Sequence, residues 1–143
     1  MINKNIFDEL ISTYAKHTDI FIGEELNLSD FRKVYNQTCE KYCYCLSKKD
    51  HKHYPTKLIK HSDEYATFLI FLAKEFYLNS YIEIAESTYL INRRLNSFDC
   101  FYTREMPDIF HLEHPIGSVI GQAKMKNYLV VFQGVSIGGN LKM

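Results

Sequence analysis

The residues best suited to chemistry lie near the end of the sequence, in two glycine-containing segments, 111–123 and 132–140. The first reads His-Leu-Glu-His-Pro-Ile-Gly-Ser-Val-Ile-Gly-Gln-Ala, and the second reads Phe-Gln-Gly-Val-Ser-Ile-Gly-Gly-Asn. A positioned imidazole such as that of His114 can remove the proton of a reacting hydroxyl near neutral pH, an effect typically worth about 10²- to 10⁴-fold in rate. The sequence therefore predicts an acid–base site at His114, and other elements must position its ring.

Aliphatic residues and glycines around this histidine repeat at a spacing typical of a β-helix. Ile-Gly pairs at 120–121 and 137–138 lie 17 residues apart, and Leu129 and Val135 lie six apart. This spacing indicates a coil of about three six-residue sides, in which an aliphatic residue of each side faces the interior and glycine adopts the corner conformations. We expect a left-handed parallel β-helix.

The sequence before residue 100 has the pattern of α-helices. In four segments apolar residues recur at intervals of three and four, which places them on one helical stripe. Ser29 and Ser62 are predicted to cap the second and third helices with their hydroxyl groups. Ser80 and Glu83 have the spacing of a capping box for the fourth, which is expected to continue to about Asn96.

Two prolines mark the change from helices to strands. Pro107 and Pro115 exclude a helix across residues 107–117, and the residues that follow are β-formers separated by glycine and polar corners. We therefore predict an α+β chain with an all-helical domain at 1–104. The start of a left-handed parallel β-helix, with incomplete coils, is predicted at 105–143.

The composition argues against several classes of partner. Seventeen basic and seventeen acidic residues give a net charge of zero, so no general electrostatic force attracts the chain to nucleic acid or anionic lipid. No segment approaches the roughly 20 apolar residues of a membrane span, and residues 1–16 lack the apolar run of a signal peptide. We expect a cytoplasmic protein with no nucleic-acid or membrane partner.

A cysteine cluster is the second group of residues that could do chemistry. Cys39, Cys43 and Cys45, followed by His51 and His53, are potential zinc ligands. Cys39 and Cys43 lie one helical turn apart, but Cys45 would point to another face of the helix, and zinc modules use paired sets of closely spaced ligands. We therefore interpret the cysteines as buried helix thiols and expect no metal.

Three blocks of the C-terminal region occur in a characteristic order: 113–117 (Glu-His-Pro-Ile-Gly), 119–123 (Val-Ile-Gly-Gln-Ala) and 133–139 (Gln-Gly-Val-Ser-Ile-Gly-Gly). In order and nearly in spacing they resemble the bacterial serine O-acetyltransferases of the hexapeptide-repeat class. The resemblance covers residues 99–140 with useful specificity. It implies an all-helical N-terminal domain followed by a left-handed β-helix, and acetyl-CoA as the co-substrate.

The resemblance also implies roles for individual residues. His114 corresponds to the base that deprotonates the acceptor hydroxyl as it attacks the thioester of acetyl-CoA. Asp99, fifteen residues upstream, corresponds to the carboxylate that orients this base, and Asp108 is the rival partner. Glu113 stands where the family has an aspartate that contacts the amino group of the substrate.

Gly138 and Gly139 have two interpretations. Their amides could approach the pantetheine arm of acetyl-CoA closely, because glycine leaves room for a ligand beside the backbone, or corner geometry alone could select them. The intact family works as trimers with sites between neighbouring β-helices, and the helical domains often join two trimers. The resemblance thus implies a homo-oligomer.

The function implied by this resemblance is that of a serine O-acetyltransferase, which forms O-acetylserine for cysteine biosynthesis. The family continues for several more coils, which carry an Arg-His pair for the substrate carboxylate, so the sequence ending at Met143 is expected to be a C-terminally truncated form. The first alternative is O-acetylation of a sugar hydroxyl. The second is a catalytically inactive helical oligomerisation module. The sequence leaves the exact acceptor, the oligomer size and inhibition by cysteine open.

Overall fold

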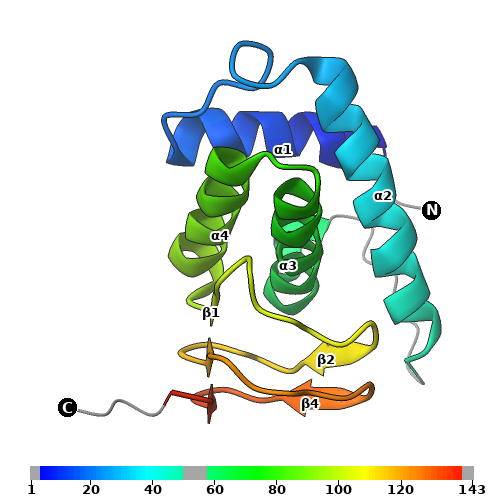
Figure 1. Ribbon diagram of the computed structural model, residues 1–143, viewed down its shortest axis with the longest axis vertical. Helices are drawn as coiled ribbons and strands as arrows, with labels where there is room; N and C mark the ends of the chain where they lie inside the picture. The colour runs from blue at the N-terminus through cyan, green and yellow to red at the C-terminus, as the bar shows by residue number, and fades with distance from the viewer. Residues whose placement is uncertain (1–3, 50–57, 140–143) are drawn as a thin grey trace.

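The computed structural model describes residues 4–49 and 58–139, in which helices precede strands (Figure 1). Ile2, at the expected start of the first helix, lies outside these residues, as do His51 and His53. The α-helices are α1 (Lys4–His17), α2 (Leu28–Ser47), α3 (Ser62–Leu78) and α4 (Ile82–Asn96), with a short 3-10 helix at Leu58–Lys60. The fourth helix ends at the predicted residue.

Helix α3 forms the centre of the helical region. Its side chains are buried around its whole circumference over most of its length, because α1, α2, α4 and the strands surround it. An aromatic core links the helices: Phe31 of α2 stacks on Phe76 of α3 with ring centroids 5.7 Å apart, and Tyr14 of α1 packs edge-on against both. The hydroxyl group of Tyr14 is hydrogen-bonded to Thr88 of α4. The core thus ties all four helices together.

The cap of α2 differs from the prediction. Asn27 is the N-cap residue, and its side-chain oxygen accepts a hydrogen bond of 2.9 Å from the backbone N–H of Asp30. The Asp30 carboxylate in turn accepts from the side-chain amide of Asn27 at 2.8 Å. The prediction of Ser29 as the cap is wrong because the helix begins earlier, at Leu28, and Asn is an equally good capping residue.

The other two predicted caps are also wrong. Ser62 is the first residue of α3 rather than its cap, and His61 occupies the N-cap position. Ser80 lies before the N-cap residue of α4, Tyr81, and has a left-handed backbone with φ of 68°. A capping box needs its serine at the N-cap, so Ser80 and Glu83 do not form one.

Five short strands follow the helices and are all paired in parallel. They are β1 (Asp99–Cys100), β2 (Phe110–Leu112), β3 (Val119–Ile120), β4 (Leu129–Val131) and β5 (Ser136–Ile137). One sheet has the order β1-β3-β5 and the other pairs β2 with β4. The register joins Asp99 to Val119, Phe110 to Leu129 and Val119 to Ser136, so successive coils are 20, 19 and 17 residues long.

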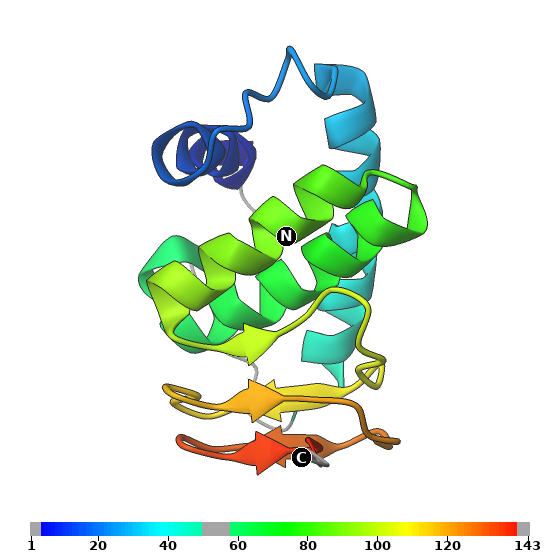
Figure 2. The ribbon, with the colours of Figure 1, turned by 60° about the vertical axis from the view of Figure 1, so that its left-hand side comes forward.

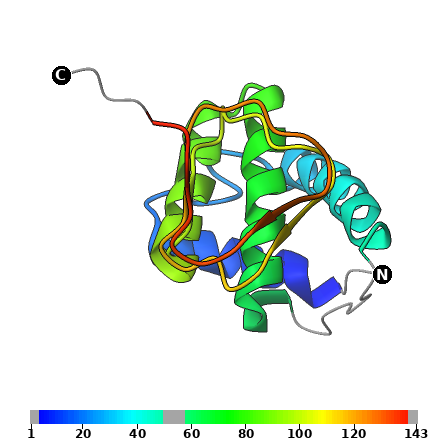
Figure 3. The ribbon, with the colours of Figure 1, turned by 90° about the horizontal axis from the view of Figure 1, so that it is seen from below.

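The coils stack directly on one another. Figure 2 shows β1, β3 and β5 as successive layers below the helices, and Figure 3, seen along the stack, shows the coils following nearly the same outline. As predicted, residues 107–117 contain no helix. Pairing of the coils begins at Asp99, just after α4. The division of the chain at residue 104 stays a prediction.

The coils and the helices share one hydrophobic core. Along β2, Phe110 and Leu112 are buried and His111 between them is half-buried, as the alternation of a strand requires. The Phe110 ring lies 5.4 Å from that of Phe71 of α3, and the Cys45 thiol of α2 donates a hydrogen bond to the Phe110 carbonyl at 3.3 Å. This packing holds the turn that follows β2 against the helical region.

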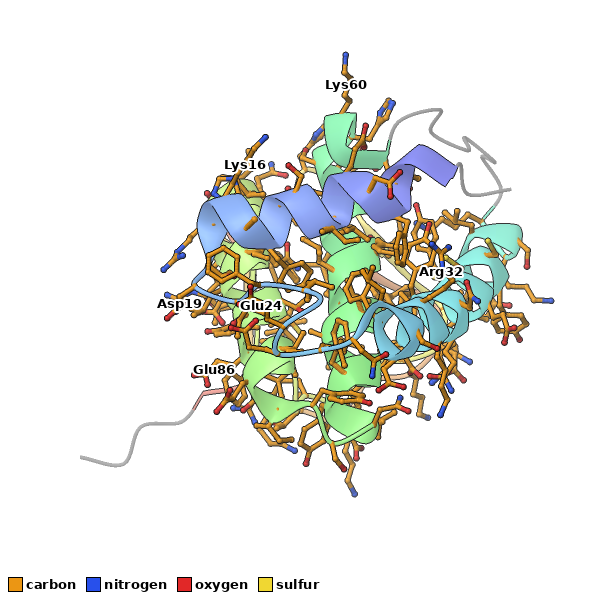
Figure 4. The ribbon with its side chains drawn as sticks, turned by 90° about the horizontal axis from the view of Figure 1, so that it is seen from above. Lys16, Asp19, Glu24, Arg32, Lys60 and Glu86 are labelled. Carbon is orange, nitrogen blue, oxygen red and sulfur yellow. The ribbon has the colours of Figure 1, made fainter. Side chains whose placement is uncertain are left out.

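The end of the molecule away from the coils is covered by α1 and carries many charged side chains. Figure 4 views this end and labels six of them: Lys16, Asp19, Glu24, Arg32, Lys60 and Glu86. Among the described helices none is both long enough and apolar enough to span a bilayer. The contacts between histidine and carboxylate side chains, His111 with Glu113 and His114 with Asp63, lie at the other end, where the coils meet the helices.

Candidate functional site

His114 occupies a tight turn directly after β2. Its backbone is left-handed, with φ of 47°, a conformation in which His is several-fold enriched among the few non-glycine residues that adopt it. The turn is closed by the Ile116 N–H, which donates to the His114 carbonyl at 2.8 Å, and the Gly117 N–H donates to Ser97 at 2.8 Å. The His114 side chain is 74% exposed. The turn therefore presents the imidazole to solvent on a fixed backbone.

Two carboxylates flank the imidazole of His114. Oδ2 of Asp63, in the first turn of α3, lies 3.6 Å from Nδ1 and accepts a hydrogen bond of 3.0 Å from the His114 backbone N–H. Oε1 of Glu113 lies 3.5 Å from Nε2. Each ring nitrogen thus faces a carboxylate oxygen.

Glu113 also contacts a second histidine. Its Oε2 lies 2.6 Å from Nε2 of His111, while its backbone N–H donates to the Val131 carbonyl at 2.9 Å. The other ring nitrogen of His111, Nδ1, is buried without a hydrogen-bond partner among the described residues. Glu113 therefore bridges two imidazoles and is fixed at both its backbone and its side chain.

Among the described residues, Asp99 contacts Tyr89 and Arg93 rather than His114. It lies in β1 with its side chain 30% exposed, accepts a hydrogen bond from the Tyr89 hydroxyl at 3.0 Å, and pairs with Nε of Arg93 at 3.3 Å. Desolvation and the bond to Asp99 raise the pKa of Tyr89. Asp108 lies elsewhere, beside a cavity that Lys41 also lines. The dyad with Asp99 stays a prediction.

Asp63 and His111 belong to this cluster although neither was predicted as a site residue. For Asp63 the reason lies in its position. The local pattern places it in the first turn of a helix, where acidic residues are common because they interact favourably with the helix dipole. Its partner His114 lies 51 positions away in the sequence, so only the packing of α3 against β2 brings the two together. No spacing rule could have identified this pair.

The two predicted cofactor glycines differ in what surrounds them. Gly138 has φ of 75°, and a Cβ there would lie 2.7 Å from the Gln122 carbonyl oxygen of the preceding coil. Gly121 is similarly close to the Ile137 carbonyl, at 2.9 Å. Gly139, with φ of 87°, has no described atom within 4 Å of its Cβ position beyond its chain neighbours. Stacking of the coils thus accounts for Gly138, whereas Gly139 borders open space.

The cysteines are free thiols. Cys45 and Cys100 are buried, whereas Cys39 and Cys43 are partly exposed. Burial raises the pKa of the Cys39 thiol to about 11 and that of Cys100 to about 12, so both thiols are poor nucleophiles near neutral pH. In the part of the chain that the structure describes, no group of three metal-ligating side chains is close enough to hold an ion.

Comparison with known proteins supports the fold most directly. No protein-family model matches the sequence, and no curated protein matches it significantly. A truncated serine acetyltransferase apoenzyme matches 80% of this chain and 52% of its own, with a TM-score of 0.64 and 13% identity. Serine acetyltransferase from Neisseria gonorrhoeae matches 93% of this chain and 56% of its own, with a TM-score of 0.69 and 16% identity.

The chain has the serine acetyltransferase fold. It corresponds to the helical N-terminal domain and the start of the β-helix, so the predicted fold class is confirmed. The chain spans about half the length of the two structures. At 13% and 16% identity the likeness concerns the arrangement of the backbone, and the roles of individual residues depend on the geometry described above.

Proposed function

We propose that this chain belongs to a cytoplasmic acetyl-CoA-dependent O-acetyltransferase whose acceptor is L-serine and whose product, O-acetylserine, feeds cysteine biosynthesis. Two observations support this proposal: the serine acetyltransferase fold and the order of the motif blocks in residues 113–139. The observation that carries it is the placement of His114, an exposed imidazole on a rigid turn with a carboxylate facing each ring nitrogen.

His114 is the general base in this mechanism. Its unprotonated ring nitrogen accepts the proton of the acceptor hydroxyl while the hydroxyl oxygen bonds to the thioester carbonyl carbon. The carbon–sulfur bond then breaks, and the imidazolium returns the proton to the departing CoA sulfur, which gives an O-acetyl ester and the free thiol. The neighbouring carboxylates of Asp63 and Glu113 stabilise the imidazolium between these two steps.

Glu113 is the residue proposed to contact the acceptor amino group. Its Oε1 faces Nε2 of His114 at 3.5 Å, and an ammonium group beside this carboxylate would bring the attached hydroxymethyl group toward the ring. Gly139 is the better of the two glycines for contact with acetyl-CoA, because its open surroundings leave the backbone accessible. We propose that no metal takes part in the reaction.

The surface of the coils supports a homo-oligomer, with a trimer or a dimer of trimers as the expected forms. Large apolar side chains on the coils are at least 44% exposed: Ile116, Val119, Tyr128, Val130 and Phe132. Apolar side chains gathered on a small domain commonly mark an interaction surface. Burial of these residues between β-helices would place neighbouring copies beside the turn that carries His114.

Acetyl-CoA-dependent thiol release tests the proposal. The purified chain is supplied with acetyl-CoA and L-serine, and free CoA is measured beside two variants, His114→Ala and His17→Ala, the latter at the end of α1 as a matched control. We expect release that requires L-serine, is lost in His114→Ala and persists in His17→Ala. Release with a sugar in place of L-serine would reassign the acceptor. Equal release by His114→Ala and the unchanged chain would refute the role of His114.

A further inference from the structure

The carboxylate nearest to Nδ1 of His114 is fixed to a helix rather than to the β-helix. Asp63 is the second residue of α3, its side chain is only 23% exposed, and its Oδ1 accepts a hydrogen bond from the Ser62 hydroxyl at 3.1 Å. Its Oδ2 accepts the backbone N–H of His114 at 3.0 Å. Asp63 lies in the first turn of α3, just before the buried part of the helix that begins at Tyr65, so its backbone belongs to the helix.

One oxygen of Asp63 therefore lies close to both the backbone N–H and the ring of His114. The hydrogen bond to the backbone N–H helps to offset the cost of the left-handed turn, since bonds to a charged acceptor are stronger than neutral ones. The same Oδ2 lies 3.6 Å from Nδ1, where a small rotation of the ring would bring an Nδ1–H within hydrogen-bonding distance. Nε2 faces Glu113 at 3.5 Å, but the other oxygen of Glu113 is bound to His111 at 2.6 Å, whereas Asp63 is tied to His114 itself through the backbone N–H.

We propose that Asp63 is the positioning residue for His114: it holds the ring and favours the tautomer with the proton on Nδ1. Nε2 is then left without a proton and can accept one from the acceptor hydroxyl. This inference rests on the proposed function, because it assigns Asp63 the orienting role for the general base. Asp99 is less suited to that role, since Arg93 and Tyr89 already occupy its carboxylate.

The arrangement also joins the helical domain to the site. Asp63 comes from the helices, whereas His114 and Glu113 come from the first coil, so the site is complete only when α3 and β2 are packed together. Phe110 of β2 fixes this packing through its ring contact with Phe71 of α3. Displacement of either element would separate Asp63 from the ring.

Nitrogen NMR of the imidazole tests this proposal without any need for activity. The ¹⁵N chemical shifts of the neutral ring report which nitrogen carries the proton, and the His114 signals are assigned by their loss in His114→Ala. We compare the chain with Asp63→Asn, Asp63→Ala and Asp99→Asn. Glu83→Gln is the matched control, because Glu83 is an exposed acidic residue in the first turn of α4.

We expect the Nδ1-protonated form to predominate in the unchanged chain. Its ratio to the Nε2-protonated form should fall about fivefold in Asp63→Asn, roughly the factor that separates a hydrogen bond to a charged acceptor from one to a neutral acceptor. Asp63→Ala should lower it at least as much. Asp99→Asn and Glu83→Gln should leave it unchanged. Asp63→Asn retains an acceptor for the His114 N–H and so keeps the fold if Asp63→Ala loses it.

Two results would overturn the proposal. One is a ratio that stays unchanged in both Asp63 variants, and the other is a fall in Asp99→Asn as large as that in Asp63→Asn. A kinetic measurement separates this outcome from failure of the proposed function: Asp63→Asn should lower kcat of thiol release more than it raises KM. If the unchanged chain releases no thiol, the proposed function fails while the tautomer ratio still decides the role of Asp63.

Discussion

A methyl group at Gly138 is expected to open the stacked coils. The left-handed backbone there, with φ of 75°, costs other residues about 1–2 kcal/mol. The added Cβ would lie 2.7 Å from the Gln122 carbonyl oxygen, whereas carbon–oxygen contacts are normally about 3.3 Å or longer. Because the neighbour is backbone and cannot rotate away, this overlap adds about 1–3 kcal/mol. Gly138→Ala should therefore destabilise the coils by about 2–5 kcal/mol.

Gly134→Ala is the matched control for this prediction. Gly134 has φ of 65°, but its Cβ position has no described atom within 4 Å beyond its chain neighbours. It should therefore show only the cost of the left-handed backbone, about 1–2 kcal/mol. The difference between the two variants, about 1–3 kcal/mol, isolates the close contact between the coils.

Amide hydrogen exchange measures the effect where it occurs, because the helices dominate global unfolding signals. The Gly121 N–H donates to the Ile137 carbonyl at 2.6 Å, directly across the contact. In Gly138→Ala its exchange should be about 5- to 150-fold faster than in Gly134→Ala, which corresponds to the free-energy difference. Equal exchange rates in the two variants would refute the close approach of the coils at Gly138.

Three further predictions concern the core and the helices. Asn27→Ala should lower the free energy of unfolding by about 1 kcal/mol, whereas Ser29→Ala should have little effect, as measured by urea denaturation. Phe110→Ala, which removes a fully buried ring, should cost about 3–5 kcal/mol in the same assay, and Phe132→Ala, 52% exposed, much less. Burial raises the pKa of the Cys100 thiol from 9.0 to about 12, so the folded state retains a proton that the unfolded chain loses. Its contribution to stability is thus complete below pH 9, should fall as the pH rises from about 9 to about 12, and alkylation at pH 8.5 should require unfolding.

The fold could be predicted because its main features depend on local periodicity. Apolar residues at helical intervals identify α3, which the structure buries on all sides, and the repeated Ile-Gly steps identify the coils. At Gly138 the sequence left contact with acetyl-CoA and corner geometry open; the structure shows a close approach of the preceding coil at Gln122, and contact with acetyl-CoA stays a prediction. The coil lengths of 20, 19 and 17 residues agree with about three six-residue sides only approximately.

The helix starts and the partner of His114 could not be predicted in the same way. The serine near each of these helix starts is a good cap by type, but its position relative to the helix depends on where the helix begins, so Ser62 became the first residue of α3. The contact between Asp63 and His114 depends on the packing of a helix against a coil. The family resemblance implied Asp99 as the partner, and this stays a prediction, although Arg93 binds the Asp99 carboxylate in the structure.

Detection of the acetylated product tests the central claim most directly. The purified chain is incubated with isotopically labelled acetyl-CoA and L-serine, and labelled O-acetylserine is measured by mass spectrometry beside His114→Ala. We predict labelled O-acetylserine from the unchanged chain and a loss of about 10²-fold or more in rate for His114→Ala. Labelled product at the same rate from both proteins, or none from the folded unchanged chain, would contradict the account.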